Sequence, residues 1–132
     1  MAKSPKILLI DDDIDFVAAT RTVLESVHYN VVVAYDGESG IRKAREEKPD
    51  LVLLDIIMPV EDGFTAAERF KKDPKLNGIP IIMLTSFSTK GQGTGIPVSS
   101  GLTLEAEDYV EKPITPDDLI KKVQQYIGKA SP

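Results

Sequence analysis

Residues 51–59 read LVLLDIIMP, in which four apolar residues lead into one carboxylate and a proline follows four positions later. A short unbroken apolar run of this kind, preceded by Pro49 and Asp50, predicts a strand that is buried on both faces. Asp55 would then lie at the carboxyl end of that strand, the edge at which ligands bind in open α/β sheets. The stretch alone leaves two interpretations open, because Asp55 could cap the following loop or act as a reactive group.

The composition bounds the classes of protein to which the chain could belong. Its 132 residues suffice for one domain with its own hydrophobic core, and the net charge of −5 argues against general binding to nucleic acid. The absence of cysteine excludes disulfides and thiol chemistry, and a single histidine, His28, excludes a histidine-rich metal site. The first six residues lack the apolar core of a signal peptide, and no apolar run could span a bilayer. We therefore expect a cytoplasmic protein with no membrane insertion and no direct contact with nucleic acid.

Strands and helices are predicted to alternate along the chain. Further apolar or β-branched runs predict strands at residues 6–10, 31–35, 79–84 and 108–111. Helical spacing of apolar residues predicts helices at residues 16–27, 38–47, 64–73 and 116–127, with Asp13 or a neighbour and Thr115 as caps. Such alternation favours a parallel sheet with helices on both faces.

The segment between the last two predicted strands departs from this alternation. Residues 88–101 hold four glycines, a proline and several Ser and Thr residues. Because glycine and proline both oppose a helix interior, residues 86–104 are predicted to form an irregular loop.

Parallel strands all end at one edge of their sheet, so residues that are scattered in sequence would meet there. They are residues 11–13, Asp55, Thr85 and Lys112. Two or three carboxylates without a counter-ion repel, and one tends to take up a proton unless a cation such as Mg²⁺ relieves the repulsion. Together with a lysine and a hydroxyl, this set suits phosphoryl transfer, for which a carboxylate is the only good nucleophile present.

Four pieces of sequence, each at a predicted strand end, resemble one known family. They are residues 7–13 (ILLIDDD), 53–63 (LLDIIMPVEDG), 81–86 (IIMLTS) and 108–114 (DYVEKPI). In this order they resemble the response-regulator receiver domain of two-component signalling, of the chemotaxis-regulator kind. The resemblance covers about residues 6–128 and implies a single domain over residues 1–132. It also implies a doubly wound five-stranded parallel sheet of flavodoxin-like order 2-1-3-4-5, here with the usual fourth helix short or missing.

The resemblance assigns roles to the acidic residues. Asp55 matches the residue that accepts a phosphoryl group in this family. Asp12 would bind Mg²⁺ directly, Asp11 would do so largely through water, and Ile57 would offer its backbone carbonyl to the metal. Asp13 is interpreted as a helix cap or a solvated acid rather than as a ligand.

The resemblance also assigns roles at the other strand ends. Thr85 matches the hydroxyl that moves towards the phosphoryl group, and Lys112 matches the lysine that pairs with it. Tyr109 matches the switch aromatic that turns inward as Thr85 moves, although it could also be a plain packing residue. A cis bond is expected between Lys112 and Pro113.

The implied function is that of a signalling switch rather than an enzyme acting on other substrates. The domain would take a phosphoryl group from a sensor histidine kinase or a phosphotransfer protein, with Mg²⁺ as cofactor. It would then change conformation and signal by contact with a downstream protein that the sequence does not name. A homodimer is a further possibility.

Two other functions remain open. A phosphatase of the haloacid-dehalogenase type would use Asp11 as nucleophile and Asp13 as acid and base, with Thr85 and Lys112, but it leaves Asp55 unexplained. A receiver-like interaction module that is never phosphorylated is the second alternative. The substitution Asp55→Asn separates the three, because it should abolish phosphoryl uptake, spare phosphoester hydrolysis, or change nothing, respectively.

Overall fold

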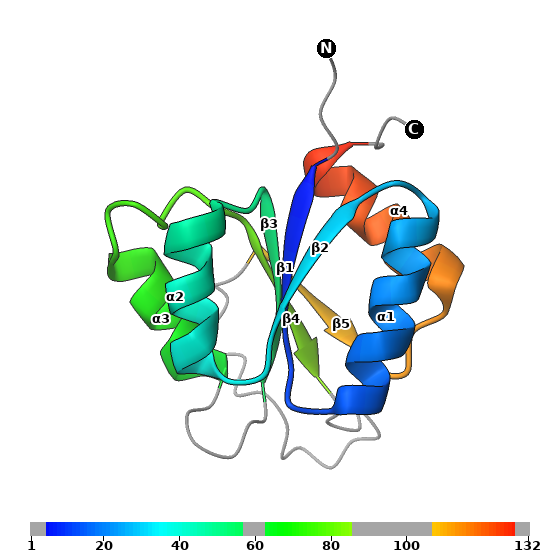
Figure 1. Cartoon of the computed structure of the whole chain (residues 1–132), viewed down its shortest axis with the longest axis horizontal. Helices are drawn as coiled ribbons and strands as arrows, with labels where there is room; N and C mark the ends of the chain where they lie inside the picture. The colour runs from blue at the N-terminus through cyan, green and yellow to red at the C-terminus, as the bar shows by residue number, and fades with distance from the viewer. Residues whose placement is uncertain (1–4, 57–62, 86–106, 129–132) are drawn as a thin grey trace.

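A single parallel sheet forms the centre of the molecule. The computed structural model describes residues 5–56, 63–85 and 107–128. Its strands are β1 (Lys6–Ile10), β2 (Asn30–Ala34), β3 (Leu51–Asp55), β4 (Ile81–Thr85) and β5 (Asp108–Glu111). They pair in parallel in the order β2-β1-β3-β4-β5 (Figure 1). The predicted doubly wound sheet and its strand order are therefore confirmed.

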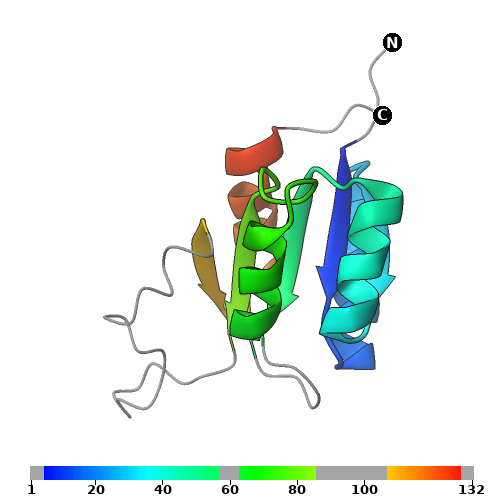
Figure 2. The ribbon, with the colours of Figure 1, turned by 90° about the vertical axis from the view of Figure 1, so that its left-hand side faces the viewer.

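Helices cover both faces of the sheet. They are α1 (Ile14–Ser26), α2 (Gly37–Glu47), α3 (Gly63–Lys72) and α4 (Pro116–Ile127). Figure 1 shows α2 and α3 on one face and α1 and α4 on the other, and Figure 2 shows α2 and α3 side by side in front of the sheet. The predicted loop at residues 86–104, and with it the short or missing fourth helix, lies outside the described residues. None of the helices in the described ranges has the length and apolar content needed to cross a membrane.

Each face of the sheet has its own hydrophobic core. Successive side chains of a strand point to opposite faces, so Val52 and Leu54 of β3 pack with α2 and α3, whereas Leu51 and Leu53 pack with α1 and α4. All five residues of β3 and of β4 are buried. The unbroken apolar runs in the sequence thus reflect burial on two faces, as predicted.

Side-chain caps begin three of the helices. The cap bonds are Asp13 Oδ1 to the Phe16 N–H at 3.1 Å, Asp36 Oδ1 to the Ser39 N–H at 2.7 Å, and Thr115 Oγ1 to the Asp118 N–H at 3.2 Å. Each cap satisfies a backbone donor that has no partner within its helix. The predicted caps of α1 and α4 are confirmed, and the cap of α1 fixes the turn that follows β1.

Two strands have bounds that differ from the prediction. β4 was expected from residue 79 but begins at Ile81, because Pro80 has no N–H and Ile79 donates instead to Leu76 O at 3.0 Å. β2 ends at Ala34, so Tyr35 lies beyond the strand with 49% of its surface exposed. Neither difference changes which residues end at the carboxyl edge.

Close contact between α2 and β1 depends on one glycine. A Cβ atom added to Gly40 would lie 2.3 Å from Ile10 Cδ1, which is far inside van der Waals contact. The glycine therefore lets α2 pack directly on the strand residue that precedes Asp11.

Candidate functional site

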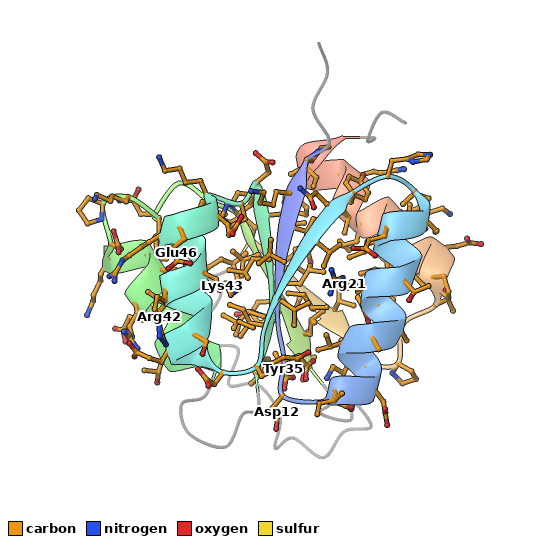
Figure 3. All side chains as sticks on the ribbon, viewed as in Figure 1. Asp12, Arg21, Tyr35, Arg42, Lys43 and Glu46 are labelled. Atoms are coloured by element: carbon orange, nitrogen blue, oxygen red, sulfur yellow. The ribbon has the colours of Figure 1, made fainter. Side chains whose placement is uncertain are left out.

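The carboxyl ends of the strands bring together four charged residues that are distant in sequence. Asp11 and Asp12 follow β1, Asp55 is the last residue of β3, and Lys112 follows β5. Figure 3 shows Asp12 at this edge of the sheet, near Tyr35 at the end of β2. One carboxylate oxygen each from Asp11, Asp12 and Asp55 lie within 4.8 Å of one another.

Backbone hydrogen bonds extend the strand pairing past the strand ends. They join Asp11 N to Ala34 O at 3.1 Å, Ile56 N to Leu84 O at 2.9 Å, and Lys112 N to Thr85 O at 2.6 Å. Because rigid strands hold these residues, their side chains meet in a defined geometry. The Lys112–Pro113 peptide bond is cis, as the resemblance implied.

Lys112 is the positive charge that contacts the buried carboxylates. Its Nζ lies 2.8 Å from Asp11 Oδ2 and 3.5 Å from Asp55 Oδ1, and 14% of its side chain is exposed. The other oxygen of Asp11 accepts a hydrogen bond from the Asp13 N–H at 2.9 Å. Asp11 Oδ2 and Asp55 Oδ1 are both buried and accept no hydrogen bond from the residues that the structure describes, but Asp11 Oδ2 lies closer to the Lys112 ammonium. Asp55 is thus the less compensated of the two carboxylates.

The pKa values of both Asp55 and Lys112 are raised in this cluster. Burial raises the pKa of the Asp55 carboxyl from 3.8 to about 6, with the Asp11 carboxylate adding to the rise and the Lys112 ammonium opposing it. Burial lowers the pKa of Lys112, but the carboxylates of Asp11 and Asp55 outweigh it and raise that pKa overall. The lysine therefore stays charged at neutral pH, and it contacts two of the three clustered carboxylates, Asp11 and Asp55.

The donor set fits a hard divalent cation. Three carboxylates converge, and a buried oxygen of Asp55 has no hydrogen-bond donor among the described residues. Asp12 is exposed, so an ion could reach the cluster from solvent. Mg²⁺ prefers a few carboxylates together with retained waters. The predicted fourth ligand, the carbonyl of Ile57, lies outside the described residues.

Thr85 and Tyr109 lie on neighbouring strands and on the same face of the sheet. Thr85 is 4% exposed and alternates with Ile81 and Met83, which pack in the core under α2 and α3. Tyr109 is partly buried against that core and pairs with Met83 in the strand register. Tyr109 is therefore a diagonal neighbour of Thr85, two positions back along the next strand.

One further residue, Phe16, lies at this edge and was not among the predicted site residues. The ring of Phe16, in the first turn of α1, lies beneath Lys112, with 4.2 Å between the ring centroid and Nζ. Helical spacing assigned Phe16 only to the apolar stripe of α1. Its position in the turn that follows Asp11 and Asp12 was the signal that could have placed it at the site.

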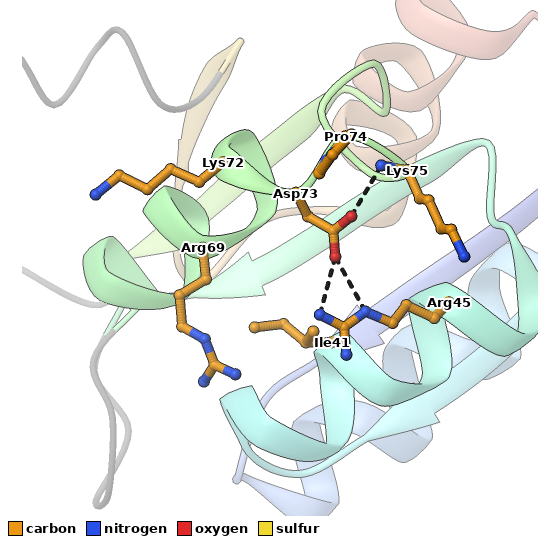
Figure 4. Close-up of a pocket in the computed structure, with 7 residues that line it drawn as sticks. All are labelled: Ile41, Arg45, Arg69, Lys72, Asp73, Pro74 and Lys75. Carbon is orange, nitrogen blue, oxygen red and sulfur yellow. Dashed lines mark hydrogen bonds and ion pairs between the residues drawn. The ribbon is translucent and has the colours of Figure 1, made fainter.

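A hollow of about 560 Å³ lies elsewhere, between α2 and α3 (Figure 4). The carboxylate of Asp73 lines this hollow and pairs with Nε and Nη2 of Arg45, at 3.0 and 2.9 Å. It also accepts a hydrogen bond from the Lys75 N–H at 2.8 Å. Arg69 at its rim pairs with Glu38 at 3.1 Å. These are paired surface charges, so the hollow lacks the uncompensated group that marks the carboxyl edge.

Comparison with protein families agrees with the geometry. The family model of the response regulator receiver domain matches residues 7–124. The chain belongs to the response regulator receiver domain family.

Named relatives of this receiver domain differ in length. It is 35% identical over 126 residues to a probable transcriptional regulator, ycf27, of Guillardia theta, covering 96% of this chain and 46% of the relative. It is 33% identical over 125 residues to the alkaline phosphatase synthesis transcriptional regulatory protein PhoP of Bacillus subtilis, covering 95% and 48%. The chain thus spans about half the length of these relatives. In contrast, the match to protein PilH of Pseudomonas aeruginosa, at 36% identity over 123 residues, covers 93% of this chain and 98% of PilH.

Solved structures share the receiver fold. A CheY-like response regulator receiver domain protein of Methanospirillum hungatei superposes with a TM-score of 0.81 at 29% identity, covering 93% of each chain. The receiver domain of a sensor histidine kinase from Pseudomonas aeruginosa gives a TM-score of 0.82 at 28% identity, covering 96% of this chain and 100% of that one. The latter is described as having a magnesium ion coordinated in its active-site cleft.

Proposed function

We propose that Asp55 accepts a phosphoryl group from a histidine kinase or a phosphotransfer protein and that this modification switches the domain between signalling states. The placement of the Asp55 carboxylate carries the proposal. The carboxylate is buried, and its Oδ1 lies 3.5 Å from Lys112 Nζ. One of its oxygens also lies within 4.8 Å of a carboxylate oxygen of Asp11 and of Asp12. A carboxyl group whose pKa is about 6 is mostly ionised at neutral pH and is a better nucleophile than an ordinary aspartate.

In the transfer step, a carboxylate oxygen of Asp55 attacks the phosphorus atom of the donor. A new O–P bond forms, the bond from phosphorus to the donor nitrogen of a phosphohistidine breaks, and the product is an acyl phosphate. Lys112 is close enough to Asp55 to neutralise charge on the transferring oxygens. Asp11, Asp12, Asp55 and the Ile57 carbonyl would hold a Mg²⁺ ion, which supplies further positive charge to those oxygens.

The response to phosphorylation would begin at Thr85. Its hydroxyl would hydrogen-bond to the phosphoryl group, and Tyr109 would turn inward into the space that Thr85 leaves. The arrangement of the two residues supports this proposal, because they occupy one face of the paired strands β4 and β5. The altered surface would then bind a downstream protein or a second copy of the domain.

The two alternative functions fit the geometry less well. A phosphatase that used Asp11 as nucleophile would need a free oxygen, but one oxygen of Asp11 accepts a hydrogen bond from the Asp13 N–H and the other lies 2.8 Å from Lys112 Nζ, closer than Asp55 Oδ1 at 3.5 Å. Its acid–base partner would be Asp13, whose Oδ1 instead caps α1. A module that is never phosphorylated would have no use for the under-compensated Asp55 carboxylate.

Incubation with a small phosphodonor and Mg²⁺, followed by intact mass measurement, tests the proposal. The wild type should gain the mass of one phosphoryl group, and Asp55→Asn should gain none. Asp73→Asn is the matched control, since Asp73 lies outside the site, and it should gain the group as the wild type does. Uptake by Asp55→Asn, or hydrolysis of added phosphoesters by that variant, would favour the phosphatase, and no uptake by the wild type would favour the unphosphorylated module.

A further inference from the structure

The aromatic ring of Phe16 contacts the Lys112 ammonium, which also contacts two carboxylates. An ammonium group has three N–H donors and no acceptor. The Lys112 ammonium lies 2.8 Å from a carboxylate oxygen of Asp11 and 3.5 Å from one of Asp55. The centroid of the Phe16 ring lies 4.2 Å from the same nitrogen. The face of an aromatic ring attracts a cation at this distance. The ring therefore covers part of the ammonium, whose side chain is only 14% exposed.

Phe16 is itself held by the residues that hold Lys112. The Phe16 N–H donates to Asp13 Oδ1 at 3.1 Å, and the Asp13 N–H donates to Asp11 Oδ1 at 2.9 Å. Asp11 Oδ2 contacts Lys112, which in turn lies on the Phe16 ring. These contacts form a closed loop, so the start of α1 and the end of β5 fix one another.

We propose that Phe16 is a positioning residue for phosphoryl uptake, because its ring shields the Lys112 ammonium from water and holds it between Asp11 and Asp55. The inference rests on the proposed function of Asp55. A charge that is shielded from water acts more strongly on a neighbouring group and needs no reorganisation during the reaction. Without the ring, Lys112 would be hydrated on its open side and would spend less time near Asp55.

Plain packing is the alternative explanation, since Phe16 also contacts the core under α1 and α4. The two explanations differ in what they require of the side chain. Packing requires an apolar group of suitable volume, which leucine supplies. Positioning requires the face of an aromatic ring, which tyrosine keeps and leucine lacks.

The test compares Phe16→Leu with Phe16→Tyr in the whole chain, by the rate of phosphoryl uptake from acetyl phosphate at saturating Mg²⁺. We expect Phe16→Leu to slow uptake about three- to tenfold, and Phe16→Tyr to stay within about twofold of wild type. Val23→Ala is the matched structural control, because Val23 lies on α1 against the same core, and it should leave the rate unchanged. Uptake by Phe16→Leu at the wild-type rate would overturn the proposal.

A second measurement needs neither Mg²⁺ nor phosphate. The ring current of Phe16 should shift the Hε and Nζ proton resonances of Lys112 upfield in NMR spectra of the unmodified protein. Phe16→Leu should remove this shift and Phe16→Tyr should keep it, whereas an unchanged Lys112 signal in Phe16→Leu would refute the contact. If the wild type takes up no phosphoryl group, the proposed function fails, and the NMR result still decides whether the ring holds the lysine.

Discussion

Asp55 and Asp73 lie in two regions of the same molecule that treat a carboxylate in opposite ways. Asp73, after α3, accepts hydrogen bonds from the Lys75 N–H and from two nitrogens of Arg45. The Lys75 backbone bond and the arginine hold its pKa below the usual value despite some burial. Asp55, at the end of β3, is 3% exposed and lies 3.5 Å from Lys112 Nζ, and its pKa rises to about 6.

A nearby cation therefore does not by itself keep the pKa of a carboxyl group low. Both residues have one, and they differ in the number of hydrogen-bond donors and in their access to water. Between α2 and α3, Asp73 has both a cation and a backbone donor, whereas at the carboxyl edge Asp55 Oδ1 has no hydrogen-bond donor among the described residues. Perturbed buried groups of this kind cluster at functional sites, and this supports the proposed role of Asp55.

The sharpest contrast is expected from removal of the cation in each region. Lys112→Met leaves the buried carboxylates of Asp11 and Asp55 without a counter-charge, which should lower the free energy of unfolding by about 3 kcal/mol in buffer free of Mg²⁺. Arg45→Met breaks a pair whose arginine is 56% exposed, so it should lower that free energy by less than about 1 kcal/mol. Urea unfolding of both variants measures the difference, and equal losses would contradict the comparison.

Near neutral pH, neutralising Asp55 should stabilise the fold, whereas neutralising Asp73 should destabilise it. The native state binds the Asp55 proton more tightly than the unfolded chain does, so stability falls as pH rises from 3.8 to about 6. Asp55→Asn removes this loss and should be more stable than wild type above that range by about 1–3 kcal/mol, with little difference below pH 3.8.

The native pKa of Asp73 is lowered instead, so its stabilising effect is present above the unfolded pKa and is lost as pH falls through the native value. Asp73→Asn should therefore be less stable than wild type near neutral pH and should approach it in acid. Denaturant titrations of both variants across this pH range provide the test, and a shared sign at neutral pH would break the contrast.

A smaller effect is expected from Mg²⁺ itself. An ion that binds only the folded state at ten times its Kd stabilises that state by about 1.4 kcal/mol. Thermal unfolding of the wild type should therefore shift upward with Mg²⁺, and Asp12→Asn should reduce the shift because it removes an exposed member of the cluster. Asp73→Asn should keep the full shift. A shift that survives in Asp12→Asn but not in Asp73→Asn would place the ion elsewhere.

The convergence of the site residues could be predicted from the sequence, because parallel strands always end at the same edge of their sheet. Asp11, Asp55 and Lys112 each follow an apolar run, and all parallel strands end at one edge, so their convergence could be predicted without coordinates. The position of Phe16 soon after Asp11 and Asp12 could have indicated that it lies near this edge. Its contact with Lys112 could not be predicted, because helical spacing says which face of a helix is apolar and not which polar atom lies above a given ring.

Tyr29 shows the same limit. It lies between α1 and β2, outside any periodic pattern, yet it is 3% exposed and its hydroxyl donates to the carbonyl oxygen of Gly128 after α4. An isolated aromatic residue gives no signal in the sequence for a partner that is 99 positions away. The predictions for Ile57 and for residues 86–104 fall outside the described part of the chain.

Chemical trapping of the phosphorylated residue tests the account most directly. The wild type would be incubated with a small phosphodonor and Mg²⁺ and then reduced with borohydride, which converts an aspartyl phosphate into homoserine that peptide mass spectrometry can locate. The account predicts homoserine at position 55 and at no other aspartate. Homoserine at position 11, or none at all, would contradict it.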